Sequence, residues 1–162
     1  MLKWLGALVF VVIAYQPAFA DDRQKLLGIW KLVSFETERQ DTGERSPLYG
    51  KSPKGYIIFT PEGRMMAVIE GEGRKAPQTE EERAALFRNM FAYTGMYRLE
   101  NDRFITKVDV SWNPAWSGTD QARFYKLDGE ELHIISAWAP SITFAGRPMV
   151  RGFLKWVRAK EG

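Results

Sequence analysis

Three polar residues in two neighbouring segments could together hold a small molecule. Alternation places Asp109 on one face of segment 103–112, and Gln121 and Arg123 on one face of segment 119–127. If the two segments pair as strands, these side chains could share an interior. The planar fork of an arginine suits a ligand carboxylate or Asp109 itself, so the set predicts either a polar anchor or an Asp–Arg pair that binds nothing. A one-residue shift in register would reverse both faces, so the pattern leaves the inward face open.

Catalytic chemistry has few residue types to work with in this chain. There is no Cys and one His, which excludes a disulfide scaffold, a thiolate zinc site, an iron–sulfur cluster and a cysteine nucleophile. We expect the one histidine, His133, to be a surface or packed residue, with a general base or haem ligand as the alternative. Asp109 is the candidate general base, a role that requires burial to raise its pKa. No nucleophile elbow, phosphate loop or dinucleotide fingerprint occurs, so we expect no metal and no cofactor, and binding is favoured over catalysis.

Aromatic residues are frequent, at 14% of the chain. A concave binding site is mostly apolar with a few polar groups, and one such set could line a cavity here. Its members are Tyr56, Met66, Tyr97, Trp112 and Trp138. The alternative is that they simply fill a core. The aromatic loop 113–118 could shape the mouth of a cavity or serve only as a connection.

The elements that would position these residues are mostly strands. Turn signals and alternation predict eight strands and one helix, the helix over 79–92 with Thr79 and Glu82 as a capping box. Pro61-Glu62-Gly63 and Asp128-Gly129 predict two of the hairpins. The predicted strands are 28–36, 55–60, 64–70, 95–100, 103–112, 119–127, 131–138 and 149–158, with a long loop over 37–53. Eight antiparallel strands in one domain favour a closed all-β barrel, with a β-sandwich as the competitor.

The first twenty residues have the pattern of a cleaved secretory signal. Lys3 precedes an apolar run from Trp4 to Ala14, and Ala18-Phe19-Ala20 is a small-x-small cleavage site. The run is too short for a span of about 20 residues, so we expect no stable membrane span after cleavage. The pattern therefore predicts a single domain over 21–162 in the periplasm or outside the cell. The formal charge of the chain is only +3, and its Lys and Arg residues form no basic cluster. Nucleic acid is therefore not expected as a partner.

Several runs of the sequence resemble the lipocalin-like domain family of bacteria and fungi. Leu27-Gly28-Ile29-Trp30 has the Gly-x-Trp form of lipocalins, and further matching runs are 55–65, 93–97 and 110–123. The resemblance covers 26–158 and implies a small β-barrel. It also implies that Trp30 plugs one end and that Lys155 or Arg158 packs over it. Relatives often carry His where this chain has Thr106-Lys107, which removes any role that such a His would have.

The leading hypothesis is an exported lipocalin-like protein that binds a small, mostly apolar molecule with one polar or anionic end. One alternative is an enzyme on the same barrel, an isomerase or hydro-lyase acting on a small lipid-like or polyketide-like substrate with Asp109 as base. The other is a filled barrel that acts as an interaction module, in which the helix over 79–92 caps the barrel or meets a partner. The residues expected to bind the ligand are Tyr56, Met66, Tyr97, Trp112, Gln121, Arg123 and Trp138.

Overall fold

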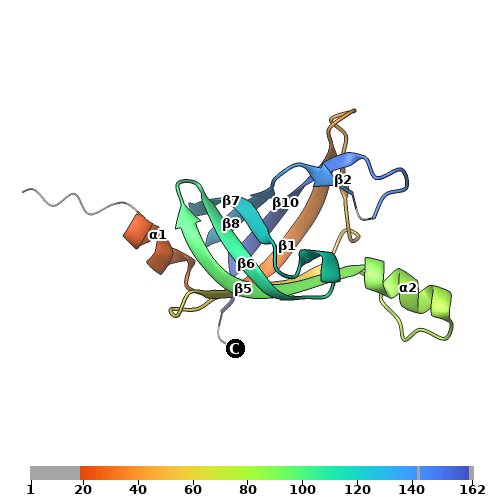
Figure 1. The fold of residues 1–162 in the computed structure, drawn as a ribbon, viewed down its shortest axis with the longest axis horizontal. Coiled ribbons are helices and arrows are strands. Elements are labelled where there is room, and N and C mark those ends of the chain that lie inside the picture. Colours follow the sequence, from red (N-terminus) through yellow and green to blue (C-terminus); the bar gives the residue numbers. More distant parts are fainter. Residues whose placement is uncertain (1–18, 142, 161–162) are drawn as a thin grey trace, which may run out of the picture.

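Eight antiparallel strands form a closed barrel in the computed structural model, which describes residues 19–141 and 143–160 (Figure 1). Each barrel strand pairs with the next one along the chain, and pairing of the last with the first closes the sheet. The barrel strands are β1 (Gly28–Arg39), β3 (Lys54–Phe59), β4 (Arg64–Glu70), β5 (Met90–Glu100), β6 (Arg103–Ser111), β7 (Asp120–Asp128), β8 (Glu131–Ser136) and β10 (Met149–Arg158). Two short strands, β2 (Arg45–Pro47) and β9 (Ala139–Pro140), pair with β1 and β10. The predicted eight-stranded all-β barrel is confirmed.

The predicted helix is present but shorter than expected. Helix α2 spans Glu80–Arg88 and begins with the predicted capping box, in which Thr79 and Glu82 satisfy each other's backbone N–H groups. The prediction that it continues to residue 92 is wrong. Residues from Met90 onward belong to β5, where Phe91 lies opposite Ile69 of β4. Pairing with β4 satisfies the backbone N–H and C=O groups of these residues. A further turn of α2 would be stabilised less, because α2 itself has no buried residue.

One end of the barrel is closed by a fully buried tryptophan. Helix α1 (Phe19–Leu26) precedes β1, and the indole Nε1 of Trp30 donates to the carbonyl oxygen of Leu26 at 2.8 Å. The guanidinium of Arg158 lies 4.1 Å from the centre of the Trp30 ring and donates to the carbonyl oxygens of Leu27 and Lys25. Of the two basic residues expected over Trp30, the structure therefore selects Arg158, whereas Lys155 pairs with Glu131 at 2.7 Å.

A bulge interrupts the pairing of β5 with β6 between Thr94 and Gly95. A Cβ atom at position 95 would collide with the carbonyl oxygen of Lys107. Glycine is therefore required here because the two backbones approach too closely for any side chain. The bulge leaves Asp109 as the extra residue on β6.

The two helices lie at opposite ends of the molecule, and α2 projects away from the barrel wall (Figure 1). Within the part of the chain that the structure describes, neither helix is long and apolar enough to cross a membrane. The predicted secretory signal, residues 1–20, lies outside the described residues apart from the first two positions of α1. It stays a prediction.

Candidate functional site

The interior of the barrel is hollow toward the end opposite Trp30. A cavity of about 380 Å³ opens there, within the range of small-molecule sites. Small residues at inward positions help to leave this space, among them Ala67 of β4 and Gly152 of β10. A Cβ atom at Gly152 would lie 2.9 Å from the ring of Phe35, so the missing side chain lets that ring lie against the wall. Because the cavity is present, the filled-barrel alternative is wrong.

Aromatic rings make up an unusual share of the cavity wall. Eight of its 26 lining residues are aromatic, about twice the share in the whole chain. Six of these rings form one connected cluster with Phe91 at its centre. The Phe91 ring centroid lies between 5.8 and 6.5 Å from those of five neighbours, namely Phe35, Tyr49, Tyr93, Trp112 and Trp116. We call these six residues the aromatic wall.

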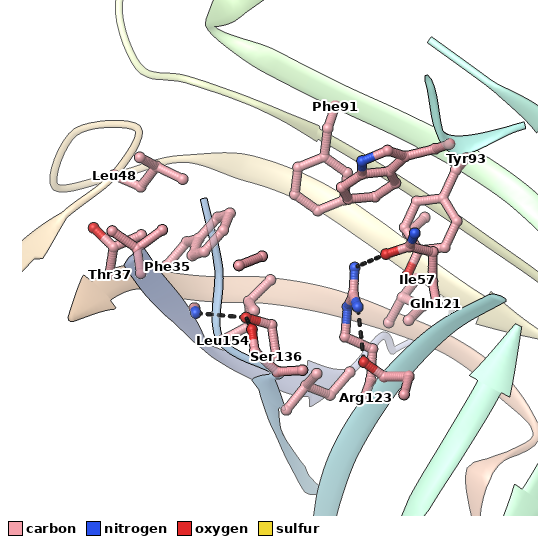
Figure 2. A pocket seen from close by; sticks show the side chains of 18 of the residues that line it. Phe35, Thr37, Leu48, Ile57, Phe91, Tyr93, Gln121, Arg123, Ser136 and Leu154 are labelled. Carbon is pink, nitrogen blue, oxygen red and sulfur yellow. Dashed lines mark hydrogen bonds between the residues drawn. The ribbon is translucent and has the colours of Figure 1, made fainter. Parts of the chain in front are cut away.

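The strand alternation explains why Arg123 points into this cavity. On β7, Gln121, Arg123 and Tyr125 alternate with the more exposed Asp120, Phe124 and Lys126, as the sequence pattern predicted for one shared face. The guanidinium of Arg123 donates to the carbonyl oxygen of Ala122 at 2.8 Å and to the amide oxygen of Gln121 at 3.2 Å. It points toward the side of the cavity where Phe91 and Tyr93 lie, while Phe35, Thr37 and Leu48 lie across from it (Figure 2).

The charge of Arg123 is not neutralised by the described residues. Both of its hydrogen-bond acceptors are neutral, and no carboxylate among residues 19–141 and 143–160 forms an ion pair with it. Asp120 is the only other charged residue among the described residues of the lining, and it pairs with Arg98 at 3.2 Å and Lys107 at 3.8 Å. The aromatic wall adds two contacts, because the guanidinium lies 5.9 Å from the centre of the Tyr93 ring and 5.5 Å from that of Trp116.

The other polar side chains of the described lining include no carboxylate, ammonium or guanidinium group. Burial raises the pKa of Tyr49 to about 12, so its hydroxyl stays protonated. Ser136 accepts a hydrogen bond from the backbone N–H of Gly152 at 2.8 Å and donates to the carbonyl oxygen of Ala137 at 3.0 Å. The cavity is thus an apolar, aromatic space with one uncompensated cation.

Three of the seven residues expected to bind a ligand line this cavity: Trp112, Gln121 and Arg123. Tyr56 and Met66 lie on the outer face, 49% and 45% exposed, because their neighbours Ile57, Met65 and Ala67 point inward. Tyr97 is buried at the closed end, where its ring packs against Phe59 at 5.2 Å. Trp138 follows the end of β8 and stacks under Arg151 at 4.6 Å, away from the cavity lining. The expectation that the cavity is lined by Tyr56, Met66, Tyr97 and Trp138 is therefore wrong.

The expectation that Asp109 shares an interior with Gln121 and Arg123 is also wrong. Phe104, Thr106 and Val108 are inward residues of β6, whereas Asp109 faces outward and pairs with Arg64 at 2.8 Å. Its side chain is 46% exposed, so the burial that a general base requires is absent. His133 likewise lies on the outer face beside Glu131 at 3.2 Å, as its alternation with the buried Leu132 and Ile134 predicted.

Most of the aromatic wall was missed as a set by sequence reasoning. Phe91 was assigned to the helix, so its place at the centre of the cluster was hidden. Tyr49 and Trp116 lie in segments without strand periodicity, in the predicted loops 37–53 and 113–118. Tyr93, Gly95 and Tyr97 alternate along β5, and all three are buried.

The comparison with protein families agrees with this architecture. The family of lipocalin-like domains matches residues 27–159. The chain belongs to the lipocalin-like domain family. The match spans every barrel strand, from the start of β1 to the end of β10. No curated protein matches the chain. A lipocalin-like barrel with an open cavity suggests small-molecule binding.

Proposed function

We propose that this lipocalin-like protein binds a small, mostly apolar molecule in its barrel cavity and holds an anionic end of that molecule with Arg123. The observation that carries the proposal is the uncompensated guanidinium inside a largely apolar space. Holding a charge away from bulk water is costly unless it is paired, and an incoming carboxylate would supply the partner. The planar fork of arginine fits a carboxylate with two parallel hydrogen bonds.

The geometry supports an anion rather than a cation as the polar end. The two acceptors near the guanidinium are already used, and Asp120 is held by two cations. A cationic ligand would therefore meet Arg123 without finding a free carboxylate on the described part of the lining. An apolar body would rest against the rings and the aliphatic side chains Ile57, Ile134 and Leu154.

The test compares an acid with its alcohol by isothermal titration calorimetry, using decanoate and 1-decanol. We expect the wild-type protein to bind decanoate more tightly, and Arg123→Met to lower decanoate affinity by about tenfold to a hundredfold, as for a lost hydrogen bond to a charged group. Decanol affinity should stay nearly unchanged. Arg103→Met is the matched control, because Arg103 lies outside the cavity lining and pairs with Glu100 near the surface. Binding of neither compound, or equal loss of both in Arg123→Met, would refute the proposal.

We propose further that the protein is exported, on the pattern of its first twenty residues. Cleavage after Ala20 would leave Leu26, the acceptor for Trp30, in the mature chain. Mass spectrometry of the protein recovered from a bacterial periplasm should show an N-terminus at Asp21. An intact N-terminus in the cytoplasmic fraction would contradict export.

A further inference from the structure

We propose that the ligand is a planar aromatic acid, because the guanidinium of Arg123 lies beside two rings of the aromatic wall, those of Tyr93 and Trp116. This inference rests on the proposed function and names the class of the apolar body. A ring stacked on the wall would carry its carboxylate toward the guanidinium.

The rings of the wall hold one another in place. Trp112 and Trp116 meet edge to face at 5.0 Å, Tyr93 and Trp116 at 5.3 Å, and Phe35 and Tyr49 at 5.5 Å. These contacts orient the rings before any ligand arrives, which lowers the entropic cost of binding. Edge-to-face and offset-stacked pairs each add roughly twofold to tenfold in affinity beyond the area that they bury. A planar ligand ring that packs on the wall gains this added affinity, whereas an alkyl chain does not.

Arg123 connects the wall to the anion site. Its guanidinium lies near both Tyr93 and Trp116, so the cation is adjacent to two rings of the same cluster. A carboxylate attached directly to an aromatic ring is coplanar with it, which lets one rigid ligand meet the guanidinium and the wall together. A flexible acid of similar size must first lose rotamer freedom to do the same.

The volume of the cavity fits a compact ligand. At about 30 Å³ for each molecule in liquid water, 380 Å³ corresponds to about a dozen waters. That space suits an acid with one or two fused rings. It lies near the lower limit for drug-sized ligands, about 300 Å³, so a long extended lipid would not be enclosed.

The test compares 2-naphthoate with decanoate, two monoanions of similar size of which decanoate is the more apolar. We expect wild-type protein to bind 2-naphthoate about tenfold more tightly, the combined effect of one or two ring contacts. Trp116→Leu should remove most of that advantage and leave decanoate affinity within about twofold. Phe124→Leu is the matched control, since Phe124 lies on the outer face of β7 and is 37% exposed.

A measurement on the wild-type protein covers the case in which Trp116→Leu fails to fold. Nuclear Overhauser contacts should join the ring protons of 2-naphthoate to those of Phe91 or Trp116. Equal or tighter binding of decanoate would overturn the aromatic class while leaving the proposed function intact. Retention of the full advantage in a folded Trp116→Leu variant, or Overhauser contacts to aliphatic side chains alone, would overturn it as well. Binding of neither acid would overturn both proposals.

Discussion

The closed end of the barrel depends on one arginine, and replacing it should destabilise the fold in a predictable way. Arg158 covers the fully buried ring of Trp30 at 4.1 Å. Its two terminal nitrogens donate to the carbonyl oxygen of Leu27 at 2.8 Å and to that of Lys25 at 2.6 Å. These contacts tie the last barrel strand to the end of α1 and to Leu27, which joins α1 to β1. Arg158→Met keeps most of the aliphatic packing and removes the charge and the donors.

The magnitude follows from those three contacts. Each hydrogen bond contributes about 0.5–1.5 kcal/mol net, and a cation over a desolvated indole adds about 1–2 kcal/mol. We therefore expect Arg158→Met to lower the free energy of unfolding by about 2–5 kcal/mol, or Tm by roughly 5–20 °C for a domain of this size. Urea denaturation followed by tryptophan fluorescence measures the first, and calorimetry the second. A loss no larger than that of Arg103→Met, an exposed pair worth at most about 1 kcal/mol, would refute the reasoning.

Three other predictions test separate parts of the fold. Hydrogen bonds from two arginines hold the pKa of Glu38 below its ordinary value, so its contribution to stability is present at neutral pH and is lost as the pH falls through the folded-state pKa. In Glu38→Gln, the urea midpoint should therefore decrease less steeply below about pH 4.5 than it does in the wild-type protein. An equally steep decrease in both proteins would contradict this. Thr79→Ala should cost α2 about 1 kcal/mol and speed hydrogen exchange there, while global unfolding barely changes because the helix buries nothing. Gly95→Ala should lower the free energy of unfolding by more than about 3 kcal/mol, because its Cβ would meet the carbonyl oxygen of Lys107. A normal midpoint in denaturation would mean that the bulge relaxes at little cost.

The barrel could be predicted because its strands are marked by local signals. Asp128-Gly129 joins β7 to β8, and Pro61-Glu62-Gly63 joins β3 to β4, as their turn residues indicated. Alternation then identified most strands to within a few residues. The two short strands β2 and β9 were missed because each pairs over only two or three residues, too few for a period-two pattern to show.

The boundary at residues 89–92 could not be predicted from local pattern alone. Ala84, Phe87 and Phe91 have helical spacing, and a strand in the same place shows no clear alternation at its start. Met90 and Phe91 form a strand rather than a further helical turn because the backbone groups of β4 pair with them. Tertiary pairing of this kind overrides propensity wherever a helix buries no face of its own.

By itself the sequence determined the fold class, the strand order and the face shared by Gln121 and Arg123, because hairpin turns and period-two alternation are local properties of the chain. Only the tertiary structure decided which face turns inward and which rings meet. Closure of the sheet buried the Ile57 and Ala67 face and turned Tyr56 and Met66 outward. It also brought residues from β1, β5 and two loops around Arg123 to make the aromatic wall. The physical reason is that burial belongs to the assembled barrel, in which residues far apart in sequence remove one another from water.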